Sequence, residues 1–198
     1  MHQINNEKIR ELLSKVHNLP VLKTNNLFGQ ERNNKIKNLI LDYEKKNPVG
    51  MDSNVKAWSS DYETHLKTDV FSDYLNYILQ FSQNSYNDMF SVNQEIIVID
   101  FWLSHYRKGD YTIKHNHGNL LNDIIISGCY YVDIEKGASP IIFEGEEPIY
   151  PENDTLIIFS SKLNHEVPPT NGERIVMSFN FYRTKKSGLS LDDYQNIA

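Results

Sequence analysis

The chain has 198 residues, of which 39% are hydrophobic and 23% are charged, and its formal net charge at pH 7 is -6. This composition excludes an intrinsically disordered chain and allows a sizeable core. The negative charge disfavours a general nucleic-acid-binding protein, and the single cysteine, Cys129, excludes an internal disulfide. No run approaches the ~18 apolar residues of a membrane span. The N-terminus is too polar for a secretory signal, so we expect a cytoplasmic protein.

The N-terminal part of the chain favours helices. Residues 5–19, 31–48 and 70–83 each carry apolar side chains at helical spacing, and a proline follows or closes the first two segments. The spacing predicts three helices that present one apolar face each. We therefore expect a mainly helical layer over residues 1–90.

From about residue 95 the pattern changes to short runs rich in Ile, Val, Phe and Tyr, separated by Gly, Pro, Asn and Asp. The predicted strands lie within residues 95–107, 110–117, 123–134, 139–145, 154–161, 163–167 and 173–183. Strands of this length and spacing are typical of a β-sandwich or barrel. We predict one α+β domain over residues 1–198, in which the helical layer packs on an all-β, double-sheet core over residues 95–183. A peripheral tail follows over residues 184–198.

Two histidines stand two positions apart in the stretch YTIKHNHG, at His115 and His117. Alternate residues of a strand share a face, so both imidazoles are expected to point the same way, together with Ile113. Imidazole is the commonest protein ligand for first-row transition metals. His165, in the later stretch SSKLNHEVPP, is the natural third member of a metal site. Incidental histidines are the alternative interpretation.

A second pattern lies on the strand expected over residues 173–183. Alternation places Arg174, Val176, Ser178 and Asn180 on one face of this strand. If that face is interior, Arg174 needs a partner, because an unpaired buried guanidinium is costly. A guanidinium is suited to hold a carboxylate, and a hydroxyl can add a further hydrogen bond. The alternative is a structural salt bridge to one of the chain's own carboxylates.

Several stretches together resemble the 2-oxoglutarate- and Fe(II)-dependent oxygenases, and more narrowly the small oxygenases of that superfamily that are common in marine phages and bacteria. The stretches are HNH, SGCYYV, DTLIIFSS and LNHEVPPTNGERIVMSFN, with SNVKAWSS and FWLSHYRKGDY upstream of them. The resemblance covers roughly residues 50 to 183 and is specific only when the stretches are taken jointly. If the protein is encoded by a phage, its expected location is the host cytoplasm.

The resemblance implies a double-stranded β-helix, or jelly roll, with Fe(II) between its sheets. His115 and His165 would be metal ligands, and His117 occupies the third position. Most of the superfamily has Asp or Glu in that position, so this chain departs from the usual ligand set. Asp123, inside the apparent insertion GNLLND, is the alternative third ligand, and we favour His117 over it.

The resemblance also assigns the cosubstrate site. Arg174 would bind the distal carboxylate of 2-oxoglutarate, with Ser178 assisting. Whichever of Tyr130 and Tyr131 faces inward would supply another hydrogen bond. Asn180 is a weaker candidate for contact with the metal or the cosubstrate.

Other residues carry smaller expectations. Asp154 and Ser160 stand where the family prefers Gly and Pro, and we expect them to be tolerated turn variants. Trp58 either covers the mouth of the site or packs onto the sheet. His105 lies either near the site or at the surface. The strand aromatics are expected mostly in the core, and the alternative is that one or two of them line a substrate pocket; they are Trp102, Tyr106, Tyr130, Tyr131 and Phe143.

The predicted function is therefore that of an enzyme, a 2-oxoglutarate-dependent dioxygenase that hydroxylates its substrate. The cofactors implied are Fe(II), 2-oxoglutarate and O2, and the products from the cosubstrate are succinate and carbon dioxide. The substrate class stays open between a protein residue, a metabolite and a nucleobase, and so does the oligomeric state. One alternative is a cupin-like metal-dependent dioxygenase or isomerase without 2-oxoglutarate. Another is a non-enzymatic jelly-roll binding or structural protein.

Overall fold

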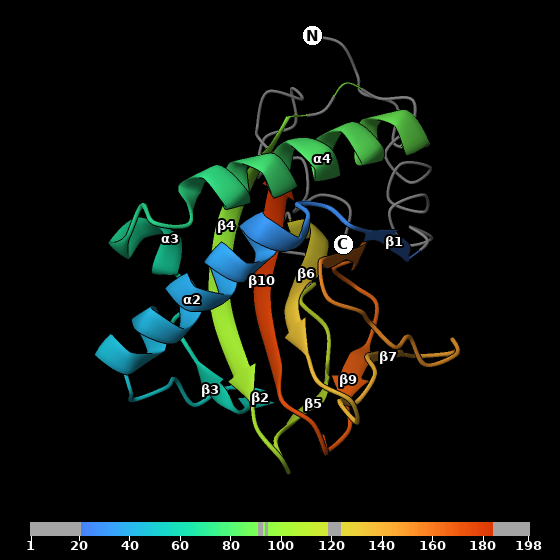
Figure 1. Cartoon of the computed structure of the whole chain (residues 1–198). Coiled ribbons are helices and arrows are strands. Elements are labelled where there is room, and N and C mark those ends of the chain that lie inside the picture. Colours follow the sequence, from blue (N-terminus) through green and yellow to red (C-terminus); the bar gives the residue numbers. More distant parts are fainter. Residues whose placement is uncertain (1–20, 91–92, 94, 119–123, 184–198) are drawn as a thin grey trace, which may run out of the picture.

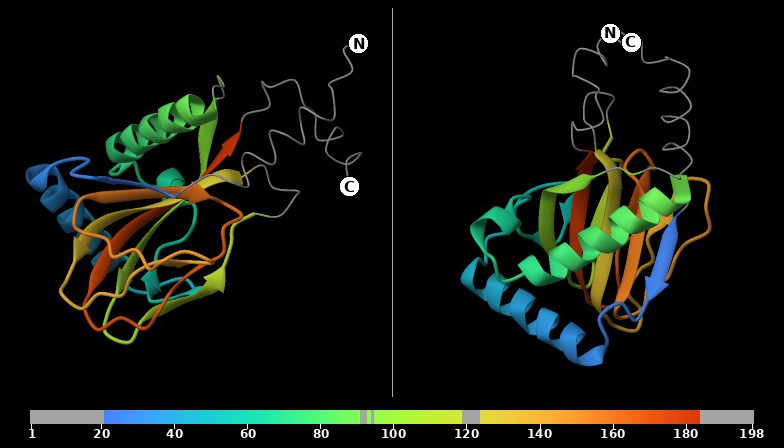
Figure 2. Two further views of the ribbon diagram at one scale, coloured as in Figure 1. Left: turned by 90° about the vertical axis from the view of Figure 1, so that its right-hand side faces the viewer. Right: turned by 90° about the horizontal axis from the view of Figure 1, so that it is seen from above.

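A computed structural model describes residues 21–90, 93, 95–118 and 124–183 of the chain. Its strands form two antiparallel sheets, which lie face to face (Figures 1 and 2). The larger sheet has the order β1 (Leu22–Asn25), β8 (Thr155–Ser160), β6 (Ile124–Ile134), β10 (Arg174–Arg183), β4 (Ile96–Tyr106) and β3 (Trp58–Ser59). The smaller sheet has the order β2 (Val55–Lys56), β5 (Tyr111–His115), β9 (His165–Val167) and β7 (Ile142–Phe143). The predicted double-sheet core is thus confirmed, with the difference that β1, β2 and β3 come from the segment predicted to form the mainly helical layer.

Helices cover the outer face of the larger sheet, as Figures 1 and 2 show. They are α2 (Gln30–Lys46), the single turn α3 (Thr64–Lys67) and α4 (Ser72–Phe90). Two of the three predicted helices correspond to α2 and α4, and the third, over residues 5–19, lies outside the described residues, as does the predicted tail. In the part of the chain that the structure describes, no helix is long and apolar enough to cross a membrane.

The strand β10 lies in the middle of the larger sheet, between β6 and β4. Its residues Ile175, Met177, Phe179 and Phe181 are buried in the cluster that includes the apolar face of the helices. The ring of Phe179 crosses directly over Gly128 on β6, where a Cβ atom would lie 2.4 Å from the ring atom Cζ. A glycine is needed at this position, because any side chain would displace the aromatic ring from the core.

Trp58 and His105, for which the sequence allows two positions each, lie between the helices and the larger sheet. Trp58 is buried in the core, and its Nε1 donates to the carbonyl of Asn47 at 2.9 Å, so it packs onto the sheet and does not cover the site. His105 is also buried, neither at the surface nor at the site. Its ring nitrogens lie 2.7 Å from a carboxylate oxygen of Glu44 on α2 and 3.2 Å from one of Glu173.

Asp154 has a larger role than that of a tolerated turn variant. Its backbone is left-handed, with φ 59°, which explains why a glycine suits this position and why Asp is among the residues that tolerate it. Its carboxylate accepts hydrogen bonds from the backbone N–H groups of Phe28 at 2.8 Å and Gly29 at 2.6 Å. It also lies 2.7 Å from the hydroxyl of Tyr130. Asp154 therefore ties the segment before α2 to the larger sheet.

We predict that Asp154→Ala lowers the free energy of unfolding by about 3 kcal/mol. The variant leaves buried N–H and O–H donors without an acceptor. It also places alanine, which disfavours the left-handed conformation, at a positive φ. Asp154→Asn, which keeps one acceptor oxygen and the left-handed preference, is expected to cost clearly less. Urea unfolding followed by circular dichroism measures both. Equal losses for the two variants would contradict the role of the carboxylate.

Candidate metal centre and ligand pocket

His115 and His165 are brought together by strand pairing, since they are direct partners in the antiparallel pair β5–β9. The register of this pair shifts between Thr112 and His115, which marks a bulge in β5. As a result Thr112 and His115 both line the pocket between the sheets, while Ile113 is 45% exposed. The prediction that Ile113 shares a face with the histidines is wrong, because the bulge interrupts the alternation on which it depended.

The three histidines converge on one point. One ligand atom from each of His115, His117 and His165 lies within 4.8 Å of the others, and the Nε2 atoms of His117 and His165 are 3.3 Å apart. Two nitrogens that each lie about 2.1 Å from one ion are separated by roughly 3 Å, so this spacing fits a shared metal ion. Among the described residues this is the one group of metal-ligating side chains with such spacing.

Two of these imidazoles are oriented for coordination by the backbone. Nδ1 of His115 lies 2.8 Å from the carbonyl of Ile113, and Nδ1 of His165 lies 3.0 Å from the carbonyl of Leu163. A carbonyl only accepts, so each Nδ1 carries the proton and each Nε2 presents a lone pair toward the cluster. Burial lowers the pKa of all three histidines, that of His165 to about 4, which keeps the rings neutral and able to bind a metal.

His117 lies just beyond the end of β5 and has a different environment. Its Nδ1 is 3.4 Å from the amide nitrogen of Asn180, which also donates to Asp100 at 2.8 Å, while the amide oxygen accepts from Ser127 at 2.7 Å. The carboxylate of Asp100 fixes the amide so that a donor faces His117. In the metal-free protein Nε2 of His117 therefore carries the proton and donates to His165. Metal binding at His117 requires this proton to leave.

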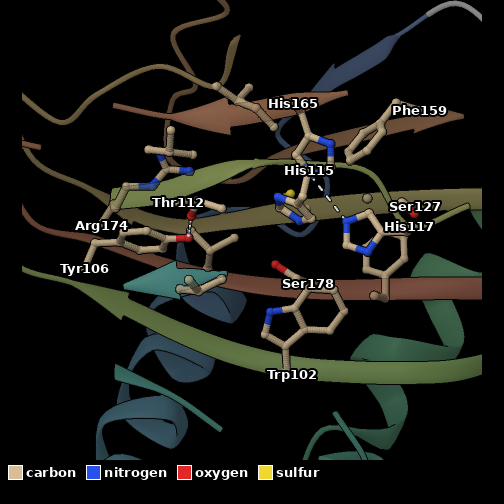
Figure 3. Close-up of a pocket in the computed structure, with 17 residues that line it drawn as sticks. Trp102, Tyr106, Thr112, His115, His117, Ser127, Phe159, His165, Arg174 and Ser178 are labelled. Atoms are coloured by element: carbon tan, nitrogen blue, oxygen red, sulfur yellow. Dashed lines mark hydrogen bonds between the residues drawn. The ribbon is translucent and has the colours of Figure 1, made fainter. Parts of the chain in front are cut away.

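A pocket with about 440 Å³ of space, including its open mouth, extends from the histidines to Arg174 (Figure 3). Side chains from both sheets line it. No Asp or Glu is found among the described residues that form its wall. Ser178 lines the pocket, as predicted from alternation along β10, whereas Asn180 lies behind His117 and contacts that ring.

Arg174 is 2% exposed and lies at the end of the pocket away from the histidines. Its guanidinium carbon is 4.9 Å from the ring centre of Tyr106 and 5.2 Å from that of Tyr131, and one Nη donates to the carbonyl of Ser139. Among the described residues no carboxylate pairs with it, and its Nε has no acceptor. The expected alternative of an internal salt bridge is therefore absent from this part of the chain.

The two adjacent tyrosines of β6 face opposite ways. Tyr131 is fully buried, and its side chain packs against Arg174. Tyr130 faces the helices, where its hydroxyl lies 2.6 Å from the side-chain oxygen of Asn33. Of the two candidates for cosubstrate contact, Tyr131 is the inward one, and Tyr130 is excluded because the sheet separates it from the pocket.

Sequence reasoning missed Thr112 as a pocket residue, and for Tyr106 it left open whether the ring lies in the core or lines a pocket. The hydroxyl of Tyr106 is 2.7 Å from that of Thr112, and both residues line the pocket. Tyr106 pairs directly with Arg174 across β4 and β10. Alternation along β4 could have indicated that Tyr106 faces the pocket, but only if β4 and β10 were known to be neighbouring strands.

No family model and no curated protein sequence matches the chain. Solved structures do match. A prolyl-4-hydroxylase from Pseudomonas putida has a TM-score of 0.67 at 14% identity, over 89% of this chain and 99% of that one. A viral collagen prolyl hydroxylase from Paramecium Bursaria Chlorella virus-1, in complex with 2-oxoglutarate, has a TM-score of 0.62 at 16% identity, over 83% and 96%. HygX from Streptomyces hygroscopicus, with nickel and 2-oxoglutarate bound, has a TM-score of 0.59 at 12% identity, over 89% and 87%.

The chain has the fold of these proteins. At identities this low the likeness establishes the fold alone, and the double-stranded β-helix predicted from the sequence is confirmed. The similar structures do not assign roles to individual residues of this chain. Roles for individual side chains must therefore rest on the geometry of this pocket.

We predict that the metal-free protein loses stability as the pH falls from 6.5 to 4, in part through His165. The pKa of His165 is about 4 in the folded chain and 6.5 when exposed, so in this interval the unfolded state binds a proton that the folded state does not. This contributes about 3 kcal/mol. The advantage of wild type over His165→Gln in urea unfolding should accordingly shrink between pH 7 and pH 4. A constant difference would contradict the buried neutral state of His165.

A second prediction concerns the third metal ligand, because Asp123 lies outside the described residues. We expect His117→Ala to weaken Zn(II) binding by about 100-fold, a loss typical of removing one ligand or its fixing partner. Asp123→Ala serves as the matched variant and is expected to bind Zn(II) like wild type. Calorimetric titration measures both affinities. The reverse outcome would assign the third ligand to Asp123.

Proposed function

We propose that the chain is a non-haem Fe(II)- and 2-oxoglutarate-dependent oxygenase that hydroxylates a C–H bond of its substrate. The observation that carries this proposal is the pairing of two features in one pocket. A buried guanidinium without a carboxylate partner among the described residues lies at one end, and three converging imidazoles lie at the other. A small dicarboxylate with a metal-binding keto acid at one end matches both features.

The histidines fit a bound metal. His115 and His165 already present lone pairs, and His117 completes a set of three nitrogens that leaves further coordination positions for other ligands. Bound Fe(II) and 2-oxoglutarate would together supply the activation of O2, with the overall conversion of 2-oxoglutarate, O2 and R–H to succinate, CO2 and R–OH. The residues of the chain bind, orient and enclose these groups.

Arg174 is proposed to hold the distal carboxylate of 2-oxoglutarate. Its charge is desolvated, and the aromatic rings of Tyr106 and Tyr131 on either side fix the plane of the guanidinium. Tyr131 adds a hydroxyl beside the guanidinium, and Ser178 adds one along the pocket. An anion here would satisfy groups that the protein leaves without partners.

The fold also directs the choice of first substrates to test. Several structures with this fold are prolyl hydroxylases, and one of them was solved in complex with a peptide fragment. We therefore propose peptidyl proline as the first substrate class to assay. The narrower kinship with small phage and marine-bacterial oxygenases, and a cytoplasmic location, remain predictions from the sequence.

We expect Arg174→Ala to raise the Kd for 2-oxoglutarate by about 100-fold, because the variant removes the partner of a buried carboxylate. Arg174→Lys should fall between this variant and wild type. The control is Arg107→Ala, which removes an arginine that pairs with Glu44 outside the pocket. Calorimetry on the Zn(II)-loaded protein gives the affinities, and iron-dependent succinate formation gives the activity.

Unchanged 2-oxoglutarate affinity in Arg174→Ala would reject the assignment of that residue. Metal binding without any 2-oxoglutarate binding would instead favour a cupin-like enzyme that works without this cosubstrate. Absence of both metal and 2-oxoglutarate binding would point to a non-enzymatic binding protein.

A further inference from the structure

Trp102 occupies the wall of the pocket between its two ends. It lies on β4, is 6% exposed and pairs across the sheet with Ser178 on β10. Its ring centre is 5.9 Å from that of His117 and 5.1 Å from that of Tyr62, whose ring is nearly perpendicular to the indole. In Figure 3 the indole lies beside Ser178, between the histidines and the end that holds Arg174. Contacts with two neighbouring rings restrict the orientation of the indole.

The indole N–H of Trp102 is buried and has no acceptor among the described residues. Leaving a buried donor unpaired costs on the order of 1–3 kcal/mol, whereas a phenylalanine would fill the same wall without this cost. The other tryptophan provides a contrast within the same chain, since Nε1 of Trp58 donates to the carbonyl of Asn47 at 2.9 Å. The unpaired N–H of Trp102 therefore indicates an acceptor that arrives with a ligand.

The composition of the pocket wall identifies the kind of acceptor. Nε of Arg174 is also buried without a partner, and no Asp or Glu is present among the described lining residues. A ligand complementary to this wall carries acceptor oxygens at more than one place and brings the negative charge itself. Arg174 accounts for the oxygens at one end. Contact with His117 shows that Trp102, on the wall between the two ends, adjoins the candidate metal ligands.

We propose that the indole N–H of Trp102 donates a hydrogen bond to a keto-acid oxygen of the cosubstrate, at the end of the pocket formed by the histidines. This assignment rests on the proposed function and adds a third binding point to Arg174 and the metal centre. It makes Trp102 a residue that positions the cosubstrate through direct contact. It also explains why this wall carries an indole in place of a purely apolar ring.

The chain contains only two tryptophans, which makes the assignment directly observable. In a proton–nitrogen correlation spectrum of the uniformly labelled, Zn(II)-loaded protein, the indole region holds two cross-peaks. Trp58→Phe and Trp102→Phe assign them. On addition of 2-oxoglutarate, the Trp102 proton is expected to move downfield as its hydrogen bond forms, while the Trp58 proton, already bonded in the core, stays in place.

Affinity provides the second readout. Trp102→Phe should raise the Kd for 2-oxoglutarate about tenfold, the effect of losing one hydrogen bond to a charged acceptor. Affinity for Zn(II) should stay at the wild-type value, because Trp102 offers no metal ligand. Trp58→Phe is the matched control and should leave both affinities unchanged. If Trp102→Phe does not fold, the shift of the wild-type cross-peak still decides the question.

The outcomes separate this inference from the function on which it rests. Binding of 2-oxoglutarate that depends on Arg174 but leaves the Trp102 cross-peak unmoved would overturn the role of Trp102 and leave the proposed function standing. Absence of any 2-oxoglutarate binding would overturn the proposed function and this assignment together. A downfield shift of Trp102 alone, with the tenfold loss in Trp102→Phe, establishes the contact.

Discussion

The arrangement of the interior of this protein depends on the buried guanidinium of Arg174. A desolvated cation without a carboxylate partner in the described part of the chain is unfavourable unless its surroundings compensate for it. Here two tyrosine rings flank the cation and one backbone carbonyl accepts from it, which offsets part of the cost. The remainder is left for a ligand. The position of Arg174 at the start of the central strand β10 also places it opposite the convergent histidines of the smaller sheet.

An imidazole at His117, in place of a carboxylate, removes one negative charge from the pocket. Among the described residues, the three histidines are neutral and the pocket wall adds no acidic side chain that would offset the charge of a bound divalent ion. This favours a ligand that carries negative charge itself. Hydrogen-bond donors then matter more than in a site with its own carboxylate, and the unpaired N–H groups of Trp102 and Arg174 are consistent with that need.

Sequence reasoning succeeded where a strand is regular. Alternation along β10 separated Arg174 and Ser178, which line the pocket, from the core-facing Met177, as the structure shows. It failed at Ile113, because the bulge in β5 turns this side chain to the other face of the strand, and no residue type in the sequence indicates the bulge. It also left the place of Tyr106 open, because the role of that residue depends on which strand lies beside it. Local periodicity is readable from one sequence, whereas register between distant strands is a property of the assembled sheets.

Hydrogen bonds between residues far apart in the chain are also not predictable from the sequence. Asp154 was expected to be a turn residue, and it is one, yet its carboxylate also holds backbone groups 125 and 126 positions away in the chain. No pattern within DTLIIFSS points to those partners. A left-handed Asp at the start of a strand predicts only local geometry, and the distant contacts follow from the packing of β1 beside β8.

The adjacent tyrosines of β6 have a further mechanical consequence. Tyr131 contacts the guanidinium inside the pocket, while Tyr130 meets the side chains of Asn33 and Asp154 beneath the helices. One peptide unit thus joins the interior of the barrel to the outer layer. A change in the position of Tyr131 on ligand binding would therefore act, through the shared backbone, on the hydrogen bonds that hold α2 to the larger sheet.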